Sequence, residues 1–243
     1  MESFEVPTIV SAGSDDPKAP LVILLHGRGS TETEIITLAS YLPKGVRYVA
    51  LRAPIAEGAG YAWFANKGIG RPLPESISKT MGWFYDWLDG FADHLSKIVL
   101  IGFSGGAAFG GGLILNSPKR FTGAAILYGT LPFDAGIDTS PQRLANTNIF
   151  LARGELDNVI PRDLLDRTWS YLNSDAGSNT VALLDKGGHG ISERVRGGLV
   201  IWLGEILGLP EKGMGWIAPG LIHRDVGSDR SEIPKTALKR CVD

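Results

Sequence analysis

Six short runs of apolar, β-forming residues recur along the chain, and they are nearly continuous rather than alternating with polar residues. A strand that is apolar along its whole length must be covered on both faces, as in a parallel sheet between two layers of helices. Helical patterns lie between the runs, which gives the alternation of strand and helix typical of α/β proteins. The sequence therefore predicts an α/β fold with a mainly parallel central sheet and helices on both faces. The six runs are LVILL (21–25), VRYVAL (46–51), KIVLIG (97–102), TGAAILYG (122–129), NIFLAR (148–153) and NTVALLD (179–185).

Four of the intervening helices have recognisable starts. Thr31 and Glu34 form the pattern of a capping box, in which each side chain bonds a free backbone amide of the first turn. Pro74 and Pro161 stand where proline favours the start of a helix, and Ser192 can cap a helix with its hydroxyl. Residues at helical spacing follow the last three starts, and we expect them to face the core: Ile77, Met81, Phe84, Tyr85 and Leu88; Leu164, Leu165, Thr168 and Leu172; and Val195, Leu199, Trp202, Leu203 and Ile206.

The composition excludes several classes of partner. The chain has 243 residues, of which 44% are hydrophobic, enough for one well-buried α/β domain. A formal charge of −2 gives no basic excess for nucleic acid. LVILL is too short to span a membrane, and the first residues lack the pattern of a signal peptide. Because the single cysteine, Cys241, cannot pair within the chain, a reducing compartment is the default. We therefore expect a soluble, cytoplasmic protein that neither binds nucleic acid nor inserts into membranes.

Two segments stand apart from the alternating pattern. Residues 57–72 form a Gly-rich stretch with three aromatics, longer than a plain connection requires. Residues 211–243 mix glycine, proline and both signs of charge with few apolar residues. The sequence thus predicts one domain over residues 1–210, followed by an extension with little regular structure.

Ser104 lies where one predicted strand ends and a Gly-rich helix begins. Gly102, Phe103, Ser104, Gly105 and Gly106 match G-x-S-x-G, the turn that presents a serine nucleophile above a parallel sheet. The flanking glycines let the backbone take that strained turn. The pattern is weak by itself, and its position after a strand is what makes it informative.

The glycines of the same stretch also allow a nucleotide-binding interpretation. Gly106, Gly110 and Gly112 match the glycine spacing of short-chain reductases. However, this spacing begins inside the expected helix, where it cannot hold a pyrophosphate at the helix N-terminus. Those reductases also need a Tyr-x-x-x-Lys pair, and no tyrosine of this chain has a lysine four residues on. We therefore interpret the small residues as packing the helix tightly against the sheet.

Partners for a serine nucleophile follow two later strands. A serine hydroxyl needs a base to take its proton and a third group to orient that base. Asp157 follows the strand NIFLAR and His189 follows NTVALLD, which gives the order Ser, Asp, His of α/β-hydrolases. Glu155 competes for the acid position, but Asp157 stands nearer the helix start. Asp185 precedes the histidine too closely to orient it.

The segment His26-Gly27-Arg28-Gly29 follows the first buried strand at once. A developing oxyanion needs fixed N–H donors, commonly one from such a loop and one from the residue after the nucleophile. We expect the backbone N–H groups of Arg28 and Gly105 to form this oxyanion hole, and His26 to shape the loop. The four histidines show no metal-ligand spacing, so no metal is predicted.

Together the motifs LHGRGS, RAP (52–54), GFSGG, ARGELDNVIP and GGHGIS resemble those of the phospholipase/carboxylesterase family of α/β-hydrolases. That family includes small bacterial carboxylesterases, lysophospholipases and acyl-protein thioesterases. The likeness, over about residues 18–208, implies a cofactor-free serine esterase with Ser104, Asp157 and His189 as its triad and 1–210 as its catalytic domain. The aromatic loop and the tail depart from the family's common core, so substrate choice and a homodimer stay open.

The expected reaction is hydrolysis of a small-molecule carboxylic ester through an acyl-enzyme intermediate. Only a short segment separates the strand ending at Gly129 from the one starting at Asn148, so no large lid is expected and short- to medium-chain esters are favoured. An acyl thioesterase or a lysophospholipase would use the same triad, while a non-catalytic binding protein or a reductase is a remote alternative. The candidates for the substrate pocket are Trp63, Phe64, Leu131, Phe133 and Ile160.

Overall fold

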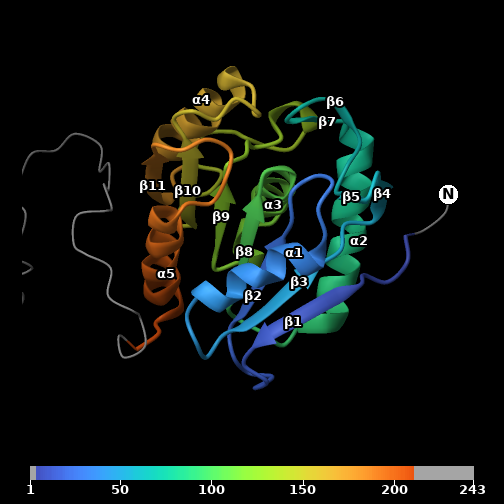
Figure 1. Cartoon of the computed structure of the whole chain (residues 1–243), viewed down its shortest axis with the longest axis vertical. Coiled ribbons are helices and arrows are strands. Elements are labelled where there is room, and N and C mark those ends of the chain that lie inside the picture. Colours follow the sequence, from blue (N-terminus) through green and yellow to red (C-terminus); the bar gives the residue numbers. More distant parts are fainter. Residues whose placement is uncertain (1–3, 211–243) are drawn as a thin grey trace, which may run out of the picture.

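The computed structural model describes residues 4–210 and contains a central seven-stranded sheet (Figure 1). Only the first strand is antiparallel to its neighbour, and the other six strands run parallel. The predicted parallel sheet is therefore confirmed. Across the sheet the strands are β1 (Ile9–Gly13), β3 (Arg47–Leu51), β2 (Leu21–Leu25), β8 (Ile98–Phe103), β9 (Gly123–Leu127), β10 (Asn148–Gly154) and β11 (Asn179–Asp185).

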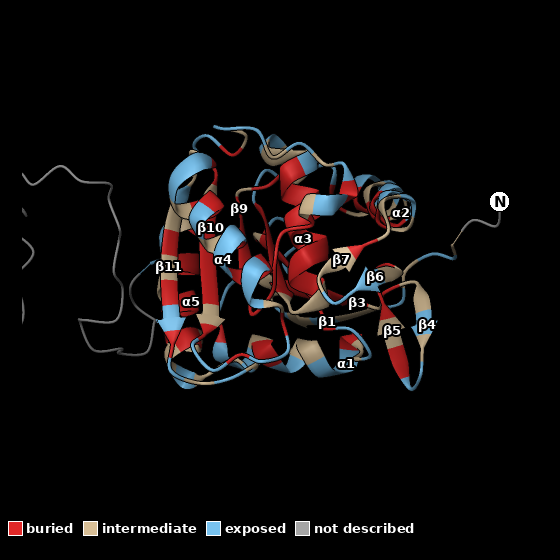
Figure 2. Cartoon of the chain, turned by 90° about the horizontal axis from the view of Figure 1, so that it is seen from above, coloured by how far each residue is buried: buried red, intermediate tan, exposed pale blue. Residues whose placement is uncertain are grey.

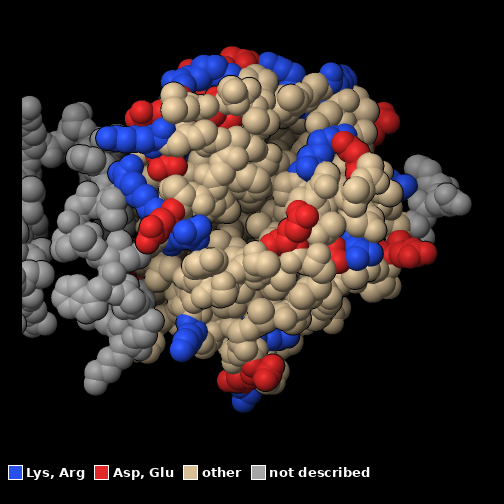
Figure 3. All heavy atoms as spheres, in the orientation of Figure 1, with Lys and Arg blue, Asp and Glu red and all other residues tan. Residues whose placement is uncertain are grey.

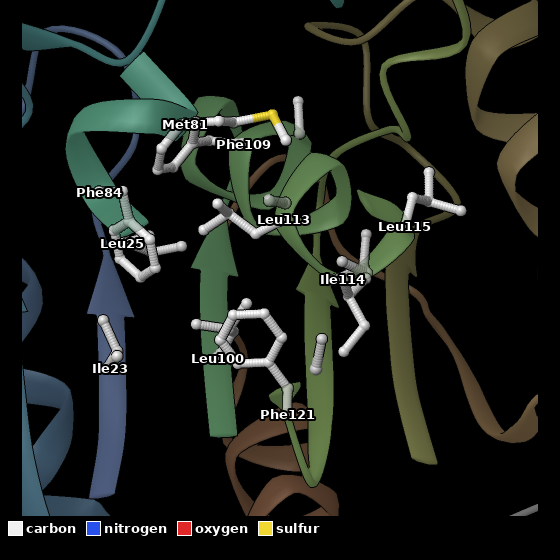
Figure 4. Packing of buried hydrophobic residues seen from close by; sticks show 14 of the residues in the cluster. Ile23, Leu25, Met81, Phe84, Leu100, Phe109, Leu113, Ile114, Leu115 and Phe121 are labelled. Carbon is white, nitrogen blue, oxygen red and sulfur yellow. The ribbon is translucent and has the colours of Figure 1, made fainter. Parts of the chain in front are cut away.

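Helices cover both faces of the sheet. The helices are α1 (Glu32–Ile35), α2 (Pro74–Ala92), α3 (Gly105–Asn116), α4 (Arg162–Ser170) and α5 (Glu193–Leu207). The core forms two clusters, one on each face, because successive side chains of a strand point to opposite sides. In β2, for example, Ile23 belongs to the cluster with α2 and α3, while Val22 belongs to the cluster with α1 and α5. Figure 4 shows the first cluster, in which the strands meet Phe84 of α2 and Phe109 of α3.

Helix α3 lies in the middle of the molecule and is buried from Gly106 to Leu115 (Figure 2). Its small residues let it approach the sheet closely. A Cβ atom on Gly102 or on Gly106 would come within 3.0 Å of backbone atoms, of Gly106 and of Leu25 respectively. Since real Cβ atoms essentially never lie that close to backbone, these two positions require glycine. The packing interpretation of the Gly-rich stretch is therefore confirmed.

Two parts of the chain form strands that the sequence does not predict. An additional strand, β1, forms the antiparallel edge of the sheet, and its residues are partly buried or exposed. The segment expected to be a loop contains two small hairpins, β4 (Ile55–Glu57) with β5 (Gly60–Ala62) and β6 (Asn66–Gly68) with β7 (Arg71–Pro72).

The predicted capping box is wrong, because the Thr31 side chain makes no capping bond and Glu34 accepts a bond from the Ser30 hydroxyl instead. The Ser192 cap does form, since its hydroxyl accepts a bond from the Val195 amide. In the part of the chain that the structure describes, no helix is long and apolar enough to cross a membrane. The predicted extension, 211–243, lies outside the described residues.

A pair of glycine substitutions tests the close approach of α3 to the sheet. We expect Gly106→Ala to lower the free energy of unfolding by about 3 kcal/mol or more, because the backbone cannot move aside without shifting the helix. Gly82→Ala is the matched control: Gly82 is exposed on α2 with no atom near its would-be Cβ. It should gain about 0.5–1 kcal/mol from helix propensity. Urea unfolding measures the free energy of unfolding of each variant. Equal values for Gly106→Ala and Gly82→Ala would contradict the packing argument.

Candidate active site

Ser104 occupies a strained turn between β8 and α3. Its backbone has φ 54° and ψ −115°, a conformation that residues with a Cβ rarely adopt. Such strain costs on the order of 1–3 kcal/mol and persists only where the surroundings enforce it. Here the Ser104 amide donates to the Leu127 carbonyl at 2.9 Å, which ties the turn to β9. The turn raises the Ser104 side chain above the carboxyl end of the sheet.

A continuous chain of hydrogen bonds joins Ser104, His189 and Asp157. The Ser104 hydroxyl lies 2.9 Å from Nε2 of His189, and Nδ1 of His189 lies 2.8 Å from Oδ2 of Asp157. The carboxylate accepts from Nδ1, so the imidazole carries its proton there and keeps an acceptor lone pair on Nε2. The arrangement orients a base toward the serine hydroxyl.

The Asp157 carboxylate is fully buried but well supplied with donors. Its Oδ1 accepts from the amides of Val159 at 2.9 Å and Ile160 at 3.2 Å, so both oxygens are engaged. Of the competing acids, Glu155 is exposed and Asp185 bonds Tyr128 rather than His189. Asp157 is thus the carboxylate that meets the imidazole.

The backbone amides of Arg28 and Gly105 lie close together near Ser104. A Cβ atom on Gly105 would lie 3.2 Å from the Arg28 nitrogen, so the two peptide units are neighbours. Gly105 is the first residue of α3, and an amide at that position has no partner within its own helix. Both residues line the cavity at Ser104. The structure thus brings the two amides together, and their role as an oxyanion hole stays a prediction.

His26 holds the loop that carries Arg28 through hydrogen bonds in the protein interior. It is fully buried, its Nδ1 donates to the Gly27 carbonyl at 2.7 Å, and its Nε2 accepts from the Ala53 amide at 3.1 Å. The Trp63 indole donates to the His26 carbonyl at 2.8 Å. Burial lowers the pKa of His26, so the ring is held neutral as a structural crosslink.

The hairpins after β3 hold the other side of this loop. The Arg28 guanidinium pairs with Glu57 and donates to the Phe64 carbonyl at 2.9 Å. The backbone adds bonds from the Gly29 amide to the Tyr61 carbonyl and from the Tyr61 amide to the Ser30 carbonyl. The segment 55–72 therefore supports the loop that carries the Arg28 amide.

A cavity of about 790 Å³ opens beside Ser104, within the range of small-molecule sites. Of the five predicted pocket residues, Trp63, Phe64 and Ile160 line it. Figure 3 shows a hollow in the face turned toward the viewer, with mostly uncharged side chains around it. Further lining residues come from α1 and the segment after it and from the loop after His189: Ile35, Leu38, Tyr41 and Ile191. No sequence motif marks these four, and the first three line the cavity because of the face of the sheet that α1 and the segment after it cover.

The other two predicted pocket residues do not line this cavity. After β9 the chain turns toward α4, where the Leu131 amide donates to the Thr168 hydroxyl at 3.0 Å. Leu131 is consequently fully buried against Gly111 of α3. Phe133 packs edge-on against Tyr171 and lies under the Arg167 guanidinium. From this segment it is Thr130 that lines the cavity.

Comparison with known proteins places the chain in a family. A family model described as Phospholipase/Carboxylesterase matches residues 5–196. The chain belongs to the phospholipase/carboxylesterase family. Members of this family are carboxylic ester hydrolases with the α/β-hydrolase fold, and the expected class of enzyme is therefore confirmed.

Relatives of known structure share this fold. The chain is similar to a Bacillus cereus carboxylesterase, with a TM-score of 0.73 and 21% identity, covering 82% of this chain and 94% of that one. It is similar to a Mesorhizobium loti carboxylesterase with a TM-score of 0.67 and 22% identity, covering 82% and 99%. A putative hydrolase, MhqD of Bacillus subtilis, is 20% identical over 177 residues, 71% of this chain and 86% of the relative.

The buried neutral His26 predicts a pH-dependent stability in this family member. Because burial lowers the pKa of His26 in the folded protein below its ordinary value of about 6.5, the unfolded chain takes up a proton first as the pH falls. The free energy of unfolding should therefore decrease below about pH 6.5, by up to about 1.4 kcal/mol per pH unit from this residue. His26→Gln should lose this contribution to the change of the free energy of unfolding with pH. His94→Gln, at an exposed histidine, is the control and should keep it. Identical slopes in wild type and His26→Gln would contradict the assignment.

Proposed function

We propose that the protein is a serine carboxylesterase that hydrolyses short- to medium-chain esters through Ser104, His189 and Asp157. The observation that carries the proposal is the unbroken hydrogen-bond chain from the Ser104 hydroxyl to the buried Asp157 carboxylate. Family membership supports ester hydrolysis as the reaction. The proposed reaction needs no cofactor.

In the first step the Ser104 oxygen attacks the ester carbonyl carbon while its proton passes to Nε2 of His189. The Asp157 carboxylate, which already accepts the Nδ1 proton, stabilises the imidazolium that forms. The carbonyl π electrons move to the oxygen and give a tetrahedral oxyanion. The Arg28 and Gly105 amides, fixed by α3 and by the His26 crosslink, donate to that oxyanion.

Collapse of the oxyanion expels the alcohol, which takes the proton from Nε2, and leaves an acyl group on Ser104. Water then attacks the acyl-enzyme as His189 accepts one of its protons. The second tetrahedral species breaks down to the acid and the free serine. Because His189 takes a proton and then returns it in each half of the reaction, its position beside Ser104 serves both halves.

The connection between β9 and β10 supports an open site. Residues 128–147 contain only one short 3-10 helix, Phe133–Ala135, and no inserted helical layer. The cavity is walled on one side by Trp63 and Phe64, and on another by Ile160. An apolar but open site of this size fits an acyl group that reaches it from water.

Replacement of the serine is the direct test of the nucleophile. Ser104→Ala should lower kcat for an activated aryl ester by about 10⁴-fold or more, since the covalent route is lost. Ser117→Ala, which removes a hydroxyl at the far end of α3, is the control and should keep wild-type kcat. Hydrolysis that survives Ser104→Ala would overturn the assignment.

A panel of aryl esters of increasing acyl length tests the substrate class. We expect kcat/KM to peak at short to medium chains, because the site is lidless and of limited volume. The matching thioesters and a lysophospholipid belong in the same panel. A peak at long-chain emulsified triglycerides, or higher kcat/KM for thioester or lysophospholipid than for any aryl ester, would contradict the proposed specificity.

A further inference from the structure

A buried pair, Tyr128 and Asp185, lies behind the candidate site and has no part in the steps above. The Tyr128 hydroxyl donates to Oδ2 of Asp185 at 2.9 Å. Tyr128 is fully buried and Asp185 is only 6% exposed. Tyr128 has a positive φ of 48°, a backbone conformation that bulky side chains rarely adopt. The strain and the burial together show that the surroundings hold this tyrosine in one place.

The pair sits at the start of the segment 186–192, which carries His189. Asp185 is the last residue of β11, and Ser192 at the other end of the segment caps α5. Burial, and then Asp185, raise the pKa of Tyr128, while the hydroxyl and amide of Ser192 act in the opposite direction. The Tyr128 hydroxyl is thus bonded to the residue at which the histidine segment begins.

The ring of Tyr128 also faces the imidazole. Its centroid lies 6.3 Å from that of His189, with the planes at 82°, an edge-to-face contact. Phe103 lies against the imidazole at 5.2 Å and against the Tyr128 ring at 6.1 Å. Two aromatic rings therefore bound the imidazole, and the Tyr128 hydroxyl fixes one of them.

Asp185 further joins the histidine segment to the segment that carries Asp157. Its carbonyl accepts from the Glu155 amide at 2.7 Å, and the Gly187 carbonyl accepts from the Leu156 amide at 3.1 Å. A Cβ atom on Gly154 would collide with the Gly187 and Gly188 carbonyls, so the two segments pass in contact. A displacement of Asp185 would therefore move His189 relative to Asp157.

The backbone of the histidine segment is Gly-rich and lies near the surface. It contains three glycines, Gly187, Gly188 and Gly190, and most of it is exposed or only partly buried. Glycine-rich, exposed backbone is free to move unless its ends are fixed. A buried carboxylate, in contrast, is costly unless it is bonded, and the Tyr128 hydroxyl supplies that bond.

We propose that Tyr128 is a positioning residue, whose hydroxyl fixes Asp185 and thereby keeps His189 in register with Ser104 and Asp157. This inference rests on the proposed function, because the register matters for the transfer of the Ser104 proton. Tyr128 touches no reacting atom in the mechanism. Its effect should appear in kcat and not in substrate binding.

The test compares Tyr128→Phe with two other variants. Tyr128→Phe keeps the ring and removes the bond, so kcat for an activated aryl ester should fall about tenfold while KM stays within about twofold. Tyr85→Phe is the matched control, since it removes the hydroxyl of a partly buried tyrosine, bonded to the Leu113 carbonyl between α2 and α3. It should retain the wild-type kcat. Asp185→Asn keeps an acceptor for the Tyr128 hydroxyl and should retain kcat within about threefold, whereas Asp185→Ala should match Tyr128→Phe.

A second readout does not depend on esterase activity. The proton between His189 and Asp157 should give a low-field proton NMR signal in the wild type and in Tyr85→Phe, and a broadened or lost signal in Tyr128→Phe. If wild type hydrolyses no ester, the proposed function fails, and this signal alone decides the role of Tyr128. The positioning role is overturned if Tyr128→Phe matches wild type in the signal or in a measurable kcat, or if Asp185→Asn loses as much kcat as Tyr128→Phe.

Discussion

The turn at Ser104 is the constraint on which the rest of the site depends. A single residue of positive φ, Ser104, connects β8 to α3. So short a connection is possible because α3 packs closely against the sheet. The glycines at positions 102 and 106 make that approach sterically possible. The strain at Ser104 is in turn balanced by the burial of nearly the whole of α3 in the core.

The parallel sheet converts this local turn into a site. Because neighbouring parallel strands end at the same edge, the segments after β2, β8, β10 and β11 converge there. Each brings one component: the Arg28 amide, the Ser104 hydroxyl, the Asp157 carboxylate and the His189 imidazole. The cavity beside them takes residues from both faces of the sheet, Leu38 from the cluster with α5 and Trp63 from the cluster with α3.

Sequence reasoning located residues correctly where they follow the end of a buried strand. The strands are strongly apolar, so their ends could be located, and the residues that follow them could be placed along one edge. Ser104, Asp157 and His189 were predicted in this way, and the structure brings them into one hydrogen-bond chain. The same logic predicted a fold of the observed class but missed β1, because an edge strand that is only partly buried carries no continuous apolar signal.

The remaining contacts depend on directions that the chain takes in space. Leu131 and Phe133, like Asp157, follow a predicted strand within a few residues. However, the positive φ of Tyr128 and the bond of the Leu131 amide to Thr168 turn this segment toward α4 and away from the cavity. Tyr128 and Asp185 are 57 positions apart and match no motif. Their pairing follows from β9 and β11 both flanking β10, together with the local turn after β9.

Covalent labelling tests most directly the central claim, that the strained turn presents an activated nucleophile. A fluorophosphonate should modify the protein once per chain, and peptide mass spectrometry should place the modification on Ser104. His189→Ala should abolish the labelling, because the serine then lacks its base. Modification of a different residue, or labelling of Ser104 at an unchanged rate in His189→Ala, would contradict the account.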